Sequence, residues 1–164
     1  MPQTQARAEK EIESISLIVP LPASPARVFA ALTQPRDMEV WVWGGIGRDP
    51  RAEVDLRVGG RYSVSVEVGE KPDWPRSRWA MQGLFVEISP PTRLAYTVHW
   101  DAPVGYNQPG PAVDEVVFVD LVDTDGGTEL RYRHFGVPTR SAAAAHRSAI
   151  LHTFEILKKH LANE

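Results

Sequence analysis

Two of the five histidines in this chain lie where an imidazole could move a proton. His134 falls on the inward side of a predicted strand, and His146 falls on the apolar stripe of a predicted helix. An imidazole in mostly apolar surroundings can titrate near neutral pH and act as a general acid or base. A histidine hydrogen-bonded for structural reasons would give the same pattern, which places no carboxylate beside either ring. His134 and His146 are therefore candidate catalytic residues without an assigned reaction.

A larger set of aromatic residues could line a binding pocket. Tryptophan and tyrosine combine a large apolar area with one hydrogen-bonding group, which suits a pocket that orients a ring-containing ligand. The same residues could also simply fill the core. The candidate ligand-binding residues are Trp41, Trp43, Tyr62, Trp79, Tyr96, Trp100, Tyr132, His134 and Phe154.

Other kinds of chemistry are not indicated. The chain has no cysteine, and its histidines lack the HxH and HExxH spacings of metal sites. It also lacks a Gly-x-Ser-x-Gly nucleophile motif, and its glycine pairs do not have the spacing of a phosphate-binding loop. We therefore predict no metal and no cofactor. His152 and His160 are interpreted as solvent-facing residues of the last helix.

The composition is typical of a soluble protein with one domain. The 164 residues carry a net charge of −3, and 43% of them are hydrophobic. We expect one domain over residues 11–164 and a flexible tail over residues 1–10. No basic stripe favours nucleic acid, and no apolar run suits a membrane span or a secretory signal. The lack of cysteine is compatible with the cytoplasm, which is the location that we predict.

Hydrophobic periodicity predicts the elements that must position these side chains. Alternating apolar residues indicate a first strand over 12–19, and Ser24 and Pro25 have the residue types of a helix start. A second short helix is predicted from Pro35 to Trp41. Further strands are predicted over 52–58, 61–68, 78–88, 94–100, 113–122 and 129–135. The last 139–162 segment is predicted to be one helix of about six to seven turns.

This order of elements defines an architecture. Strands in series that are joined by hairpin turns form an antiparallel sheet, here of about six to seven strands. Only the C-terminal helix is long enough to cover the apolar face of that sheet. We therefore predict an α+β protein in which a curved antiparallel sheet wraps around a long C-terminal helix. Two short helices follow the first strand, and the arrangement leaves room for a cavity.

The segment from Asp55 to Tyr62 is predicted to be a tight hairpin turn. Gly59 and Gly60 can both adopt positive φ without a steric penalty, so the chain can reverse over a short distance.

Short motifs along most of the chain resemble one known fold family. The matching segments are 22–33, Trp41 with Trp43-Gly44, 55–62, Gly83 with 87–94, 127–130 and 134–138. Together they resemble the START-like (SRPBCC), or helix-grip, superfamily, and more narrowly the domain similar to the C-terminal part of the activator of Hsp90 ATPase. The family often carries Gly-Trp in the final helix, where this chain has Ala149-Ile150. The resemblance implies a cavity for small, largely apolar molecules.

The resemblance leaves three functions open, because relatives include lipid and hormone binders, aromatic polyketide cyclases and a co-chaperone. The first expectation is a protein that binds a small apolar or aromatic molecule in an internal cavity. The second is a cyclase- or hydrolase-like enzyme that acts on an aromatic or polyketide-type substrate, with His134 or His146 beside a tyrosine. An interaction with Hsp90 is the third and ranks last.

Two surface features bear on partners. The loop over 101–112 is rich in proline and glycine, and its length is typical of a lid, a binding loop, an irregular connection or a subunit contact. Val116 and Phe118 fall on the outward side of their strand, which indicates a homodimer patch. Neither nucleic acid nor a membrane is an expected partner.

Overall fold

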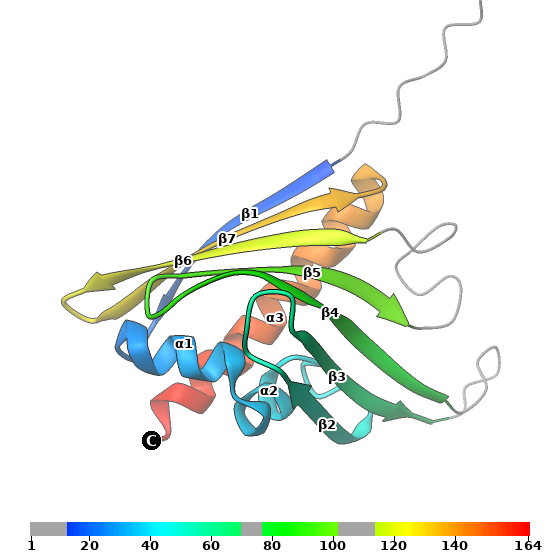
Figure 1. Cartoon of the computed structure of the whole chain (residues 1–164), viewed down its shortest axis with the longest axis horizontal. Helices are drawn as coiled ribbons and strands as arrows, with labels where there is room; N and C mark the ends of the chain where they lie inside the picture. The colour runs from blue at the N-terminus through cyan, green and yellow to red at the C-terminus, as the bar shows by residue number, and fades with distance from the viewer. Residues whose placement is uncertain (1–12, 70–76, 102–113) are drawn as a thin grey trace, which may run out of the picture.

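The structure is a computed structural model that describes residues 13–69, 77–101 and 114–164. In chain order its elements are β1 (Glu13–Leu21), α1 (Pro25–Thr33), α2 (Pro35–Trp41), β2 (Arg48–Val54), β3 (Arg61–Val68), β4 (Ser77–Ser89), β5 (Arg93–Asp101), β6 (Glu115–Thr124), β7 (Gly127–Val137) and α3 (Arg140–Ala162). The strands form one antiparallel sheet in the order β1-β7-β6-β5-β4-β3-β2. The sheet is curved, and α3 runs across one of its faces (Figure 1). The predicted fold class is confirmed.

The side of the sheet that faces α3 is apolar because side chains in a strand alternate between its two faces. In β3, Tyr62, Val64, Val66 and Val68 are buried, and the residues between them are half-buried. On the helix side, Phe154, Leu157 and Leu161 are buried in the stripe that the sequence predicts. The core therefore lies between α3 and the sheet.

Helices α1 and α3 begin at residues whose side chains cap them. The Ser24 side chain accepts a hydrogen bond from the Arg27 backbone N–H, and Pro25 occupies the first turn of α1. The Thr139 hydroxyl accepts a hydrogen bond from the Ala142 backbone N–H at 3.1 Å and begins α3. These caps satisfy backbone N–H groups in the first turns of α1 and α3.

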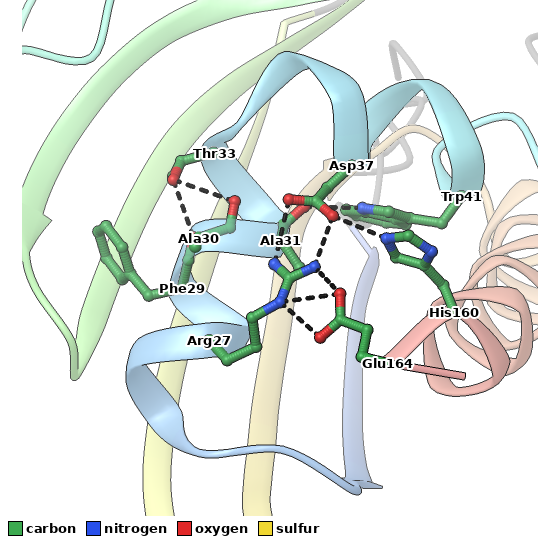
Figure 2. A network of polar contacts seen from close by, with 9 residues as sticks. All are labelled: Arg27, Phe29, Ala30, Ala31, Thr33, Asp37, Trp41, His160 and Glu164. Atoms are coloured by element: carbon green, nitrogen blue, oxygen red, sulfur yellow. Dashed lines mark hydrogen bonds and ion pairs between the residues drawn. The ribbon is translucent and has the colours of Figure 1, made fainter. Parts of the chain in front are cut away.

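A group of four charged or titratable residues, here called the Arg27 cluster, joins the three helices (Figure 2). Arg27 of α1 donates hydrogen bonds to Asp37 of α2 and to Glu164, which follows α3. His160 of α3 contacts the same Asp37 carboxylate, with 2.7 Å between Nε2 and Oδ1. The cluster fastens the C-terminal end of α3 to α1 and α2. His160 is thus half-buried and in hydrogen-bond contact with Asp37, whereas the sequence indicated a solvated residue.

The Arg27 cluster shifts the acidity of its members. The hydrogen bond from Arg27 lowers the pKa of Asp37, and the contact with His160 lowers it further, against the opposing effect of burial. Hydrogen bonds to Glu164 and Asp37 raise the pKa of Arg27. Asp37 therefore stays ionised in the folded protein to a lower pH than a free aspartate does.

The prediction for the strand before the diglycine was wrong in its position. β2 covers Arg48–Val54 rather than 52–58, and Val54 is opposite Tyr62. The chain from Asp55 to Gly60 instead folds back toward β4, where the Gly59 N–H donates to the Phe85 carbonyl. Gly59 has φ +80°, as expected, but Gly60 is required by close packing: a Cβ there would lie 2.1 Å from the Asp55 carbonyl oxygen. The turn is therefore longer than a tight hairpin.

Other differences concern strand ends. β1 continues through Pro20 to Leu21, although proline was expected to end it. Because β1 lies at the edge of the sheet, the missing N–H of a proline is tolerated there. The predicted tail over 1–10, the start of the first strand at Ile12, and residues 102–112 of the predicted loop lie outside the described residues.

The outward face of β6 is partly covered. Val116 and Phe118 are half-buried rather than exposed. The Phe135 ring packs edge-on against Phe118, and the Arg133 guanidinium lies 5.4 Å from the centre of the Phe118 ring. A homodimer through this patch stays a prediction. No helix among the described residues is long and apolar enough to cross a membrane.

Candidate functional site

A cavity of about 190 Å³ lies between α3, the segment that follows α2, and strands β4, β5 and β7. The predicted site residues that line it are Trp41, Trp43, Tyr96, Trp100, Tyr132, His134, His146 and Phe154. Apolar side chains such as Met81, Val98 and Ile150 complete the walls. The structure thus gathers side chains from both ends of the chain around one space.

Two of the predicted ligand-binding residues do not line this cavity. Trp79 faces the core from β4 and is fully buried, and its Nε1–H donates to the Ser77 hydroxyl at 2.8 Å. Tyr62 lies farther along the core, where its hydroxyl donates to the Thr97 carbonyl at 2.6 Å. Burial raises the pKa of Tyr62 well above its usual value, so the hydroxyl keeps its proton. Both residues serve the packing of the sheet.

The two tryptophans beside α2 use their polar atoms within the protein. The Trp41 Nε1–H donates to the Ala31 carbonyl, and the Trp43 Nε1–H donates to the Val64 carbonyl, each at 2.9 Å. The Trp41 ring also stacks on Phe154, with ring centres 5.9 Å apart. These rings therefore contribute apolar area to the cavity and little hydrogen-bonding capacity.

The polar wall of the cavity is a chain of three buried side chains, here called the Glu115 relay. The Tyr132 hydroxyl lies 2.9 Å from His134 Nδ1, and His134 Nε2 lies 2.6 Å from Glu115 Oε2. The side chains of His134 and Glu115 are 1% and 0% exposed. Tyr132 and His134 line the cavity, and Glu115 lies behind them. The relay links the cavity wall to a carboxylate that is removed from water.

The partners of Glu115 decide the direction of these hydrogen bonds. The Trp100 indole N–H, which can only donate, is 3.2 Å from Glu115 Oε2. Because a carboxylate oxygen can only accept, we assign the proton of His134 to Nε2, which then donates to the same oxygen as the Trp100 indole. His134 Nδ1 is then an acceptor for the Tyr132 hydroxyl. Burial, together with the nearby Tyr96 and Glu115, raises the pKa of Tyr132 well above its usual value, which keeps this hydroxyl protonated.

Sequence reasoning placed no carboxylate beside His134, and Glu115 is the candidate site residue that it missed. The signal was present, because Glu115 is in phase with Val117, Val119 and Leu121, which were predicted to face inward. A charged residue at an inward position requires a partner. The strand register supplies that partner, since β6 pairs with β7 and Val117 lies opposite His134.

Two further histidines belong to the same region. The His146 ring of α3 lies 6.0 Å, centre to centre, from both His134 and Trp100, and all three line the cavity. His152 also lines it, and its Nε2 is 3.1 Å from the Gly44 carbonyl oxygen. His152 is exposed, as the sequence predicted, and it also contacts the turn after α2. Both histidines of the predicted catalytic pair therefore lie at the cavity.

A possible metal-binding group occurs elsewhere, in the Arg27 cluster. Asp37, His160 and Glu164 each offer a ligand atom, and these atoms all lie within 4.8 Å of one another. Arg27 donates hydrogen bonds to both carboxylates, so its guanidinium already supplies the positive charge that they require (Figure 2). The group is therefore best explained as an ion-pair network.

A second hollow, of about 670 Å³, lies on the other face of the sheet, over β2 to β5. It is larger, but exposed charged residues such as Glu53, Asp55 and Arg61 form much of its rim. Water competes for such a surface, and no aromatic set or buried polar chain converges on it. We therefore regard the smaller cavity under α3 as the candidate site.

A curved antiparallel sheet around one long helix, with a cavity between them, defines the helix-grip class of START-like domains. A family model described as activator of Hsp90 ATPase homolog 1-like protein matches residues 22–162. The chain belongs to this family, as its sequence motifs indicated. A search of curated proteins found no match to the chain.

Solved structures show the same fold at low sequence identity. An uncharacterized protein from Rhizobium leguminosarum is 19% identical, with a TM-score of 0.73 over 94% of this chain and 97% of that chain. A protein from Rhizobium loti is 22% identical, with a TM-score of 0.72 over 92% and 98%. The AHSA1-like protein from Aeromonas hydrophila is 19% identical, with a TM-score of 0.69 over 92% and 93%. At these identities the similarity concerns the fold alone.

Proposed function

We propose that this protein binds a small, ring-containing apolar molecule in the cavity under α3. The observation that carries the proposal is the cavity itself, with its walls of indole, phenol and phenyl rings. Flat rings of this kind contact another ring over a large area, and pair favourably when offset or edge-on. The walls are rigid, because the indole nitrogens of Trp41 and Trp43 are hydrogen-bonded to the backbone.

The size of the cavity limits the ligand. An apolar cavity of about 150 Å³ is large enough to bind benzene, whereas sites for drug-sized ligands occupy roughly 300–1,000 Å³. A volume of about 190 Å³ therefore suits one ring with one or two short substituents. The family description names an activator of Hsp90 ATPase, and the proposal is confined to a small ligand because the aromatic residues converge on the cavity.

Fluorine NMR with para-fluorotoluene as the probe tests this proposal. The unaltered protein should broaden and shift the fluorine signal, and saturate as the protein concentration rises. Val98→Phe should abolish the effect, because Val98 is buried in the cavity wall and a phenyl ring there occupies the ligand's space. Val122→Phe is the matched control, since it adds the same ring at an exposed position of the sheet.

The outcomes separate the proposal from unspecific binding. Binding by the unaltered protein and by Val122→Phe, but not by Val98→Phe, would support a ligand in the cavity. If Val98→Phe is folded by circular dichroism and binds as tightly as the unaltered protein, the probe sits elsewhere and the proposal is wrong. An unaltered protein that leaves the signal unchanged would also refute it.

A further inference from the structure

We infer that the polar wall of the cavity is a subsite for an acidic hydroxyl group, of the phenol or enol type, on the ring of the bound ligand. This inference rests on the proposed function and specifies the chemical class of the ligand. It depends on the Glu115 relay, in which Tyr132, His134 and Glu115 are connected by hydrogen bonds of 2.9 Å and 2.6 Å.

The relay has a defined polarity that begins at its buried end. Glu115 Oε2 accepts hydrogen bonds from the Trp100 indole and from His134 Nε2–H. In the neutral tautomer that we assign, His134 Nδ1 accepts, and the Tyr132 hydroxyl donates its single proton to it. The Tyr132 oxygen keeps lone pairs for a donor from another molecule. Tyr132 therefore offers the cavity a hydrogen-bond acceptor rather than a donor.

The surroundings make this acceptor selective. Apart from the histidines and the relay, the walls are mostly apolar, so a ligand hydroxyl that misses the relay loses its hydrogen bonds to water. A hydroxyl that reaches Tyr132 recovers one in a site of low polarity, where hydrogen bonds are strong. The site should thus bind a phenol more tightly than a methyl compound of the same shape. A purely apolar cavity would bind the methyl compound more tightly.

The Glu115 relay can also accept the proton of the ligand hydroxyl. When the ligand O–H bond breaks, its proton moves to the Tyr132 oxygen, and the Tyr132 proton moves to His134 Nδ1. The product is a bound phenolate or enolate that accepts a hydrogen bond from Tyr132, beside a His134 imidazolium. No oxidant or other reactant is needed. The Glu115 carboxylate, 2.6 Å from His134 Nε2, stabilises the imidazolium.

A second feature of Glu115 favours this charge pair. Its Oε1 atom is buried, and no described residue donates a hydrogen bond to it. A buried carboxylate that lacks one of its partners is under-solvated, and a neighbouring positive charge relieves that deficit. An acidic ligand supplies such a charge by protonating His134. The relay should therefore favour acidic hydroxyls over aliphatic alcohols of similar size.

The experiment compares para-fluorophenol with para-fluorotoluene, which match in shape and differ in the hydroxyl. The unaltered protein should bind the phenol about tenfold or more tightly, because a hydrogen bond in which charge develops gives at least that factor. The fluorine shift of the bound phenol should also move toward that of free phenolate. Tyr132→Phe and Glu115→Gln should each reduce the preference and the shift. Tyr62→Phe is the matched control, because it removes a buried tyrosine hydroxyl that does not line the cavity.

Each outcome decides a different claim. Equal or weaker binding of the phenol by the unaltered protein would overturn the hydroxyl subsite, and the binding of rings would still stand. A preference for the phenol that survives in folded Tyr132→Phe and Glu115→Gln proteins would also overturn it, since the relay would not be the acceptor. Failure of both probes to bind would instead refute the proposed function. Nitrogen NMR of His134 gives a further check, as it should show the Nε2–H form in the ligand-free protein.

Discussion

Removing His134 from the Glu115 relay should destabilise the protein far more than its size suggests. In His134→Leu, Glu115 keeps the Trp100 donor on Oε2, while Oε1 already lacks a donor among residues 13–69, 77–101 and 114–164. Since the Glu115 side chain is 0% exposed, water cannot replace the donor that His134 provided to its carboxylate. Taking a hydrogen-bond donor away from a buried polar group costs about 1–3 kcal/mol in the free energy of unfolding and more for a charged one, so a loss of about 3 kcal/mol, or roughly 6–12 °C in Tm, is expected.

Replacing both partners should restore much of the loss. Glu115→Leu alone leaves His134 neutral and costs about 1–3 kcal/mol, because Nε2–H and the Trp100 indole lose their acceptor. In the double variant no charge is buried, so its destabilisation should fall short of the sum of the single changes by at least about 1 kcal/mol.

Urea unfolding followed by circular dichroism measures these free energies. Glu155→Leu, the same substitution at an exposed position of α3, should change stability by less than about 0.5 kcal/mol. If the two single changes and the double change add within about 0.5 kcal/mol, Glu115 and His134 are not coupled, and the assigned relay is wrong.

Two further predictions concern the fold around the site. Because the folded pKa of Asp37 is lowered, mainly by Arg27, its contribution to stability is present above the unfolded value of about 3.9 and is lost as the pH falls through the folded pKa. The Tm of Arg27→Met should therefore fall less between about pH 5 and pH 2 than that of the unaltered protein, and parallel Tm curves would contradict this. Gly83→Ala should destabilise the sheet by about 1–3 kcal/mol, because its Cβ would lie 2.0 Å from the Thr97 carbonyl oxygen. In urea unfolding, Gly126→Ala should be close to neutral, since nothing lies within 4 Å of its Cβ, and equal effects at the two positions would show that the close approach is not rigid.

The sequence was informative about which way side chains face. Alternation along β7 put Tyr132 and His134 on the inward side, and the helical stripe did the same for His146 and Phe154, as the structure has them. These patterns are local, so a short window contains them. Fold class followed from the same patterns, because an apolar face needs a cover and only the last helix is long enough.

The sequence could not show which part of the protein interior is left unfilled as a cavity. Trp79 faces inward as predicted but is packed on all sides, whereas Trp100 faces inward and lines the cavity. Hydrophobic periodicity indicates which face of a strand or helix a side chain lies on. It does not indicate how closely the neighbouring element packs against that side chain. The contact of Arg27 with Glu164 was beyond reach for another reason, since the two residues are 137 positions apart and meet only once α3 has packed.

The two outer strands affect how copies of this protein can associate. β1 carries Pro20, which has no N–H to give to an added strand. β2 has an irregular register between Arg48 and Arg51, and Asp49 there has φ +50°. Neither edge strand offers an unbroken row of backbone hydrogen-bond donors and acceptors to a neighbouring chain. Both edges therefore disfavour the edge-to-edge pairing of sheets that leads to fibrils. Within the part of the chain that the structure describes, the sheet faces are therefore better suited to self-association than the two edge strands.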